Sequence, residues 1–163
     1  MIGYDTALPL PLRILRLVID WGIVLGGAAL LLIVFGNALT RFVIDVNMNA
    51  ALELASFLLL WTTFLGCAAA AARGMHMRIG ELVGQLGRRA RLTVGLTVDA
   101  LVCLVLMALI WFGTLLTLSN WAEQTDVLEW PVGVHYLAMP VGSALTLVFV
   151  LHTMWRSWSG RGC

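Results

Sequence analysis

Long apolar segments alternate with short polar connections along the sequence. Four segments contain no Asp, Glu, Lys or Arg: Trp21–Thr40, Leu54–Ala72, Ala100–Ala122 and Trp130–Trp155. Because a helix rises about 1.5 Å per residue, about 20 such residues cross the roughly 30 Å hydrocarbon core of a bilayer. The pattern therefore predicts one membrane domain, residues 1–163, with transmembrane helices at approximately 17–40, 52–72, 95–121 and 130–155.

Residues 75–91 form the only sizeable polar segment. Its apolar residues fall on one face of a helix, namely Ile79, Leu82, Val83 and Leu86. This spacing predicts an amphipathic helix in the headgroup region between the second and third spans, with its arginines toward anionic lipid. Glycines within the segment lower its helix propensity, so a flexible cytoplasmic loop is the alternative.

The residues before the first span also show helical spacing. Leu12, Leu15 and Ile19 recur on one face, with arginines on the other. Two interpretations are open. Residues 1–20 form either a short helix in the headgroup region or the polar end of the first span itself.

The composition is typical of a membrane protein. Of the 163 residues, 61% are hydrophobic and 12% are charged, whereas soluble domains are close to half apolar and about a quarter charged. The expected fold class is an all-α integral membrane protein with four transmembrane helices. Little sequence remains outside the spans, which excludes a separate soluble domain and a water-facing catalytic domain. We therefore expect no enzymatic activity.

The arginines predict the orientation in the membrane. All ten basic residues are Arg, and nine of them lie before the first span, between the second and third, or after the fourth. The first connecting loop has only Arg41, and the third has Glu123, Asp126 and Glu129 without a base. Because short Arg-rich loops stay cytoplasmic during insertion, both termini are predicted to be cytoplasmic.

Charged residues are confined to the ends of the spans. An ionisable residue inside the membrane usually marks an ion or proton site, and the central parts of these spans contain no Asp, Glu, Lys or Arg. We therefore expect the chain to have no ion-binding site of its own. Asp20 and Asp99 are expected to pair with nearby arginines, while Arg41 and Glu53 pair either with each other or with a partner.

Several residues within the spans predict helix packing. Trp61 and Trp111 lie near mid-span, where the indole N–H needs a protein partner because lipid offers none, so both are expected to face protein. The small-residue run Cys67–Ala72 leaves a groove for a helix of this chain or of a partner. Gly22 and Gly26 favour close packing within this chain in preference to packing between two copies.

The sequence shows no motif for catalysis, metal binding or nucleic-acid binding. Ligation of a haem by two histidines needs two facing residues at similar depth, whereas His135 and His152 lie near opposite ends of one span. The cysteines are widely separated, which argues against a disulfide framework or a zinc site. We expect no cofactor, no metal and no nucleic acid.

A set of short motifs occurs in a fixed order along the chain: Asn37-x-x-x-Arg41-Phe42, Glu53-Leu54-Ala55, Trp61-x-x-Phe64-x-Gly66, Arg73-Gly74-x-His76-x-Arg78 and Pro140-Val141-Gly142. In order, spacing and four-helix layout, nearly the whole chain resembles the small membrane subunit, the Q component, of tripartite ATP-independent periplasmic (TRAP) transporters. Many members of that family have an acidic residue soon after the His. This chain departs from that pattern, because it has Arg78 and then Glu81 there.

The resemblance implies a function that composition does not show. Such transporters take up small organic anions, often carboxylates, through the bacterial inner membrane on a sodium gradient. A soluble periplasmic binding protein captures the solute, and a large multispan permease subunit carries the ions and the substrate. The small subunit would be a non-catalytic scaffold that contacts the large subunit, the binding protein and membrane lipids.

The resemblance and the residue pattern together give the candidate site residues. We expect six of them to stabilise the subunit or its interface with a partner: Arg41, Glu53, Trp61, Arg73, His76 and Trp111. Glu123, Asp126 and Glu129 are expected to help the binding protein dock. The alternative functions are a haem-bearing membrane anchor of a redox complex and an autonomous homodimeric transporter.

Overall fold

The computed structural model of the chain describes residues 10–44, 48–73 and 88–158. The described part contains five helices: α1 (Leu10–Ile44), α2 (Asn49–Ala72), α3 (Arg88–Ser119), the short α4 (Gly133–Tyr136) and α5 (Ala138–Trp158). Four stretches are long and apolar enough to cross a membrane, namely Leu10–Ile44, Asn49–Ala72, Thr93–Ser119 and Gly133–Trp155. The predicted all-α class with four membrane-spanning helices is confirmed.

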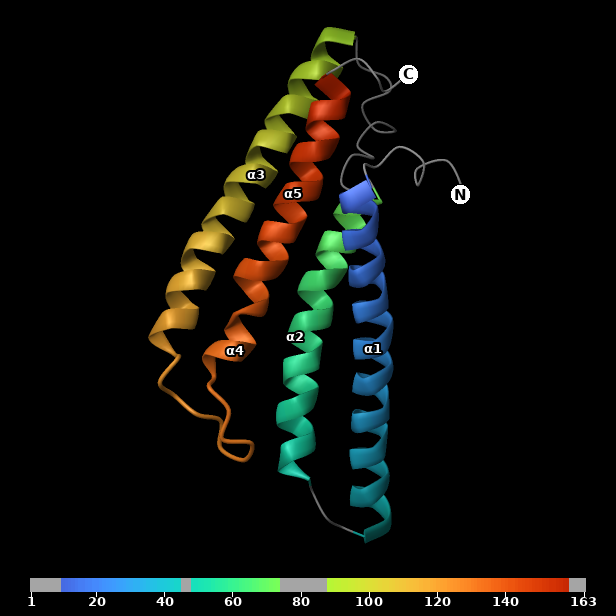
Figure 1. Cartoon of the computed structure of the whole chain (residues 1–163), viewed down its shortest axis with the longest axis vertical. Coiled ribbons are helices and arrows are strands. Elements are labelled where there is room, and N and C mark those ends of the chain that lie inside the picture. Colours follow the sequence, from blue (N-terminus) through green and yellow to red (C-terminus); the bar gives the residue numbers. More distant parts are fainter. Residues whose placement is uncertain (1–9, 45–47, 74–87, 159–163) are drawn as a thin grey trace.

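The long helices form a single row in the order α1, α2, α5, α3 (Figure 1). Within the described residues, α1 contacts only α2, α2 contacts α1 and α5, and α5 contacts α2 and α3. The beginning of α1 and the end of α5 lie at one end of this helix row, which we call the terminal end. The loop of residues 120–132 lies at the opposite end, the loop end (Figure 1). The row is open, so no helix is surrounded by the others.

Helix α1 is 35 residues long and continuous from Leu10. At about 1.5 Å per residue it spans about 52 Å, which is more than the roughly 30 Å thickness of a hydrocarbon core. Leu12, Leu15 and Ile19 belong to this helix and pack toward the core. The described residues of the N-terminal segment are therefore the polar end of the first span, and no separate short helix precedes it within them.

The fourth predicted span is divided between α4 and α5. The division falls at Leu137, three residues before Pro140. Proline has no N–H to donate to the carbonyl four residues earlier, that of Tyr136, and its ring crowds that carbonyl. The helical path nevertheless continues, because the Val141 N–H donates to the Leu137 carbonyl at 3.2 Å.

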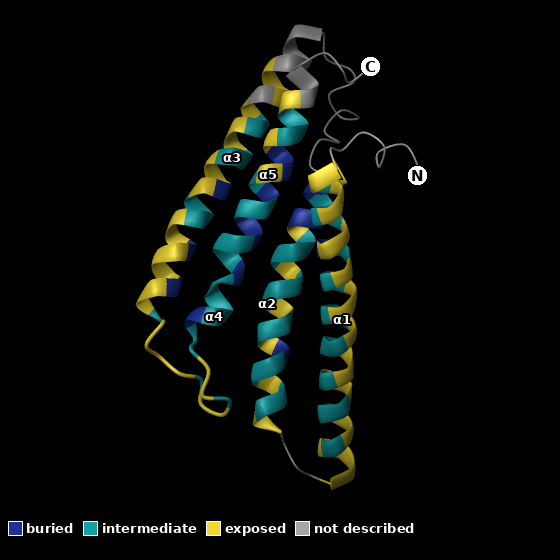
Figure 2. Cartoon of the chain, viewed as in Figure 1, coloured by how far each residue is buried: buried dark blue, intermediate teal, exposed yellow. Residues whose placement is uncertain are grey.

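The core lies where α2 passes between α1 and α5 (Figure 2). The Ala-rich end of α2 is its most buried part: Ala68 is 0% exposed and Ala69 is 4% exposed. They cluster with Ile19 of α1 and with Phe149 of α5, which is 1% exposed. Alanine lets helix backbones approach closely, and in lipid such packing replaces the hydrophobic effect as the source of association. The groove predicted at Cys67–Ala72 is thus occupied by helices of the same chain.

Two glycines mark the closest helix contacts. A Cβ at Gly26 of α1 would lie 2.7 Å from Thr62 Cγ2 of α2, and a Cβ at Gly142 of α5 would lie 2.5 Å from Phe64 Cβ of α2. Gly22 also faces α2, where an added Cβ would lie 3.7 Å from Leu65 Cδ1. The expected packing of Gly22 and Gly26 within the chain is confirmed.

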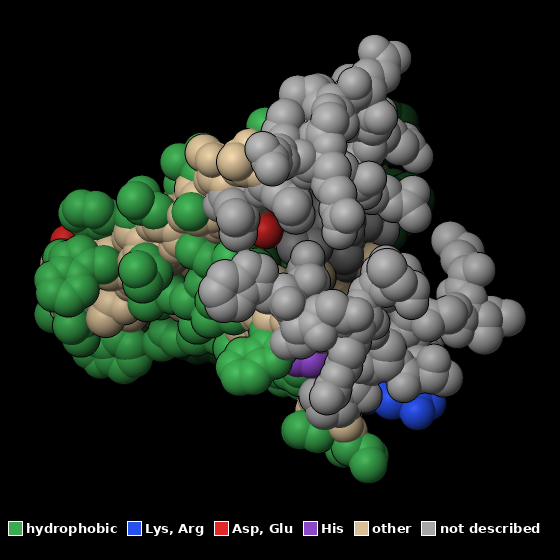
Figure 3. All heavy atoms as spheres, turned by 90° about the horizontal axis from the view of Figure 1, so that it is seen from above, with side chains coloured by type: hydrophobic (Ala, Val, Ile, Leu, Met, Phe, Trp, Pro, Cys, Tyr) green, Lys and Arg blue, Asp and Glu red, His purple; other side chains and the backbone are tan. Residues whose placement is uncertain are grey.

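Hydrophobic side chains make up most of the described surface in the view along the helices in Figure 3. Helices α1 and α3, which flank the row, carry most of the large exposed apolar residues. On α1 they include Leu31 and Leu32, and on α3 they include Leu104 and Trp111. A protein whose outer faces are this apolar requires lipid or other membrane helices around it.

The predicted amphipathic helix of residues 75–91 falls largely outside the described residues. Of that segment, the structure describes only residues 88–91, which begin α3. Helix α3 therefore starts seven residues before the predicted span, which begins at 95. The interfacial helix stays a prediction.

Candidate functional site

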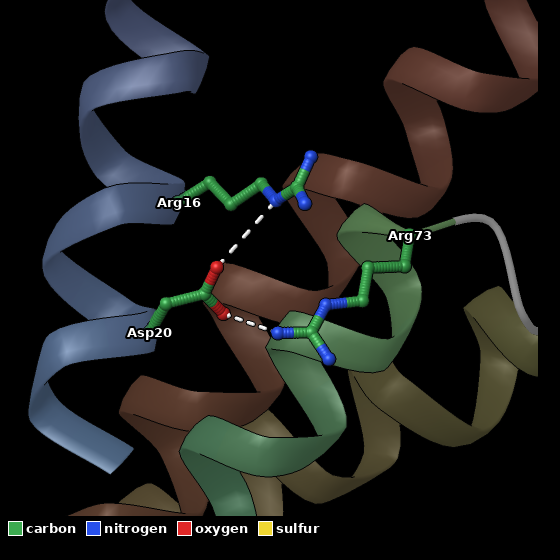
Figure 4. Close-up of polar contacts among 3 residues, drawn as sticks. All are labelled: Arg16, Asp20 and Arg73. Carbon is green, nitrogen blue, oxygen red and sulfur yellow. Dashed lines mark hydrogen bonds and ion pairs between the residues drawn. The ribbon is translucent and has the colours of Figure 1, made fainter. Parts of the chain in front are cut away.

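At the terminal end of the row, an ion-pair network joins α1 to α2. Asp20 Oδ1 of α1 accepts a hydrogen bond from Arg73 Nη2, which follows the last residue of α2, at 2.9 Å. Asp20 Oδ2 lies 3.6 Å from Nε of Arg16, one helical turn earlier on α1. Figure 4 shows the Asp20 carboxylate between the two guanidinium groups. The expected pairing of Asp20 with nearby arginines is confirmed.

The Asp20–Arg73 pair fixes geometry more than it adds stability. The Asp20 side chain is 27% exposed and the Arg73 side chain is 46% exposed, so water screens their attraction. Exposed pairs of this kind contribute about 0.2–1 kcal/mol. The pair lies beside the buried alanines of α2 and thus holds α1 and α2 in register at one end.

At the loop end, Glu53 joins α2 to the 120–132 loop. Its Oε1 accepts a hydrogen bond from the Val127 N–H at 2.9 Å, and its Oε2 accepts one from the Leu128 N–H at 3.0 Å. Charge-assisted hydrogen bonds of this type are roughly twice as strong as neutral ones. Both carboxylate oxygens are therefore used within the chain, on a segment more than 70 residues away.

The 120–132 loop has a defined backbone. The Thr125 N–H donates to the Trp130 carbonyl at 2.8 Å, and the Val132 N–H donates to the Glu123 carbonyl at 2.8 Å. Glu129 lies between the residues joined by these bonds and has a φ of 52°. This is a left-handed conformation that non-glycine residues seldom adopt. The loop is thus a closed turn, and Glu53 binds its tip.

The three acidic residues proposed for docking lie on this loop. Glu123, Asp126 and Glu129 are all exposed, and all three come from one 13-residue connection between α3 and α4. No Lys or Arg occurs in this connection. The loop therefore presents a negatively charged surface at one end of the helix row.

An aromatic cluster links α2 to the loop and to α4. Phe57 of α2 contacts Trp61 with ring centroids 6.0 Å apart, Trp130 at 6.2 Å and His135 at 5.3 Å, the last two edge to face. The Trp61 indole N–H donates to the Val134 carbonyl at 3.4 Å. The mid-span indole of Trp61 thus faces protein, where its N–H has a partner.

Two candidate residues lie apart from these clusters, and a third is not among the described residues. Arg41 is exposed near the end of α1, and within the described residues Glu53 binds the loop and not Arg41. Trp111 is 67% exposed on α3, so it faces outward from this chain. His76 lies outside the described residues.

His135 and His152 do not form a common site. They are 17 positions apart on α4 and α5, which corresponds to roughly 25 Å along a helix. No single haem iron can reach both. Within the described residues, His, Cys, Asp and Glu side chains form no group of three or more that could hold a metal ion.

Sequence reasoning missed the aromatic cluster and the partner of Glu53. The spacing of Phe57 and Trp61, four residues apart on one helix, was a signal for the first. The second had no such signal, because the groups that bind Glu53 are backbone amides, and every residue except proline carries one.

The described residues form a row of four apolar helices, with polar contacts near both ends of α2, which is the structure of a small multispan membrane protein. The sequence matches the family described as "Tripartite ATP-independent periplasmic transporters, DctQ component" over residues 30–160. The chain belongs to this family and is a small permease subunit of a TRAP transporter.

A curated relative supports the assignment. The chain is 24% identical over 158 residues to the "C4-dicarboxylate TRAP transporter small permease protein DctQ" of Vibrio cholerae serotype O1 (strain ATCC 39315 / El Tor Inaba N16961). The match covers 82% of this chain and 68% of the relative. The similarity thus extends over most of both proteins. Together with the four membrane-spanning helices, it makes this chain a multi-pass protein of the inner membrane.

Proposed function

We propose that this subunit is a non-catalytic scaffold for the large permease subunit in sodium-driven uptake of a small organic anion, which a periplasmic binding protein delivers. The observation that carries the proposal is the open row of helices. Because each long helix, among the described residues, contacts only its neighbours in the row and the short α4, two broad apolar faces are left for lipid and for a companion. A row of this kind gives lateral support and encloses no path through itself.

The α3 edge is the part of the row that we assign to the large subunit. Trp111 projects from α3 with 67% of its surface exposed. In lipid, an indole N–H at this depth stays unpaired, which is costly because nothing in hydrocarbon accepts a hydrogen bond. A helix of the large subunit can supply an acceptor. Leucines such as Leu31 on α1 have no such need, because lipid satisfies an aliphatic side chain fully.

The relative supports a proposal for the solute class. The Vibrio cholerae protein is described as part of a C4-dicarboxylate transporter, and we propose a small carboxylate for this system as well. The residues that select the solute belong to the large subunit and the binding protein. The described spans of this chain contribute apolar packing surface.

The proposed orientation places the terminal end of the row in the cytoplasm and the loop end in the periplasm. The bias of arginines toward the terminal end supports this orientation. The acidic 120–132 loop then faces the binding protein. Complementary charge on that partner would raise the association rate and the specificity of docking.

The scaffold role is tested by reconstitution. The two membrane subunits are placed in proteoliposomes with and without this chain, and uptake of a labelled dicarboxylate is measured with the binding protein outside and an inward sodium gradient. We expect uptake only when both membrane subunits are present, and no uptake by this chain alone. Sodium-dependent uptake that is unchanged without this chain would overturn the proposal.

A further inference from the structure

The two hydrogen bonds from the 120–132 loop to Glu53 link parts of the chain that are far apart in sequence. Glu53 lies in the second turn of α2, and the Val127 and Leu128 amides lie at the tip of the loop between α3 and α4. We propose that Glu53 is a positioning residue that holds this loop in the shape from which its carboxylates meet the binding protein. The inference rests on the docking role proposed for the loop.

The two hydrogen bonds from the loop to Glu53, which we call the clamp, hold a part of the loop that its other bonds do not reach. The backbone bonds from Thr125 to Trp130 and from Val132 to Glu123 close the base of the turn. Neither bond involves residues 126–129, which form the tip of the loop. The tip also contains Glu129 in a left-handed conformation, which a non-glycine residue holds only when its surroundings impose it. The two oxygens of Glu53 supply that constraint by binding consecutive amides at 2.9 and 3.0 Å.

The geometry requires a carboxylate. A glutamate offers an acceptor oxygen to each of the two amides, whereas a glutamine offers one oxygen and a donor NH2 group, which faces an N–H without bonding to it. An alanine offers neither. The hold on the loop therefore weakens in the order Glu, Gln, Ala at this position, with almost no change in size between the first two.

The position of Glu53 also determines what it does for docking. The three exposed carboxylates lie on both sides of the two amides that Glu53 binds: Glu123 and Asp126 precede the Val127 amide, and Glu129 follows the Leu128 amide. A loop that is already ordered loses less conformational freedom when a partner binds. Glu53 is thus expected to raise the affinity of the membrane complex for the binding protein and to leave the transport step itself unchanged.

The first experiment reads the clamp directly. The complete membrane complex in lipid nanodiscs is compared by hydrogen–deuterium exchange for the native chain, Glu53→Gln, Glu53→Ala and Glu123→Gln. Because two amides lose their acceptor, we expect the peptide covering the loop to gain two deuterons at the shortest labelling time in Glu53→Ala. Glu53→Gln should gain about one, by the acceptor count above, and Glu123→Gln, a matched loss of charge in the same loop, should exchange like the native chain.

The second experiment measures how strongly the binding protein docks on the membrane complex. Uptake into proteoliposomes is measured against the concentration of the binding protein. We expect Glu53→Gln and Glu53→Ala to raise the half-saturating concentration about threefold and about tenfold, and to leave the maximal rate unchanged, as expected for a change in association alone. If Glu53→Ala does not assemble, the isosteric Glu53→Gln carries both measurements.

The outcomes separate the clamp from the docking role. Native-like exchange of the loop in both Glu53 variants would overturn the proposal. Faster exchange with an unchanged half-saturating concentration, where Glu123→Gln does raise that concentration, would also overturn it, because docking would then not depend on the shape of the loop. If no substitution in the loop or at Glu53 changes that concentration, the docking role itself is wrong, while faster exchange would still establish the clamp.

Discussion

Arg73, directly after α2, donates a hydrogen bond to Asp20 of α1, with 2.9 Å between Nη2 and Oδ1. Glu53, near the other end of α2, binds the loop between α3 and α4. Helix α2 is therefore tied to its neighbours by polar contacts near both ends, and by alanine and glycine packing between them. Polar bonds near the ends and close packing along the middle agree with the scaffold role proposed above.

The Asp20–Arg73 pair can be tested with a charge reversal. We expect Arg73→Ala and Asp20→Asn each to lower the free energy of unfolding by about 0.2–1 kcal/mol, as for other partly exposed pairs. The double variant Asp20→Arg with Arg73→Asp should recover only part of the loss, because the attraction between positions 20 and 73 is restored in reverse, whereas an arginine at position 20 repels Arg16. Thermal unfolding in detergent measures the change in stability of each variant. A double-mutant cycle then isolates the interaction energy between Asp20 and Arg73.

Arg13→Ala is the matched control, since Arg13 is an exposed arginine of α1, the helix that carries Asp20. It should unfold like the native chain. Strictly additive effects of the Asp20 and Arg73 substitutions would contradict a direct interaction between them.

The contact between Gly142 and α2 gives a second prediction. A Cβ at Gly142 would lie 2.5 Å from Phe64 Cβ and 3.1 Å from the Phe64 carbonyl carbon, so Gly142→Ala must push α5 away from α2. Overpacking of this kind costs about 1–3 kcal/mol. Unfolding in a denaturing detergent should therefore occur at a lower detergent fraction than for the native chain.

Gly27→Ala provides the comparison for Gly142→Ala. A Cβ at Gly27 meets nothing within 4 Å, and alanine favours a helix over glycine by about 1 kcal/mol. Gly27→Ala should be neutral or stabilising. A loss of stability as large as that of Gly142→Ala would show that α1 packs against a surface absent from the described contacts.

The acidic loop gives a third prediction, on the dependence of uptake on salt. Replacing Glu123, Asp126 and Glu129 by Gln, Asn and Gln removes the loop's three negative charges. We expect the half-saturating concentration of the binding protein to rise by about 3-fold to 10-fold at low salt, because loss of complementary charge slows association. The difference should shrink near 0.5 M salt, where charges are screened within less than about 10 Å. Equal salt dependence in both proteins would contradict docking at this loop.

The sequence predicted the helices well and their contacts unevenly. Four charge-free segments are enough to identify four spans, since the bilayer sets their length. The packing of Gly26 and of the alanine run followed from residue size. The order of the helices in the row did not, because no periodicity states which apolar face meets which. The bond from Glu53 to the loop depends on backbone amides at the end of a turn, and so becomes visible only when the chain is folded.

The partner of Trp111 could not be identified from the sequence either. Its mid-span indole was expected to face protein, whereas it faces outward from this chain. We predict that the protein it faces is the large subunit. Trp111→Ala should leave the unfolding of the isolated chain unchanged, since 67% of the side chain is exposed, and should weaken co-purification of the two membrane subunits. Trp111→Phe, which keeps the ring and loses the N–H, should have an intermediate effect if a hydrogen bond to the partner contributes.

Leu31→Ala on α1 is the control at the opposite edge of the row, because Leu31 is 71% exposed and aliphatic. It should leave the association intact, since lipid replaces whatever contact is lost. Exchange of labelled subunits between nanodiscs measures the association for all three variants. If Leu31→Ala releases the large subunit and Trp111→Ala does not, the companion lies along α1, and the α3 edge faces lipid.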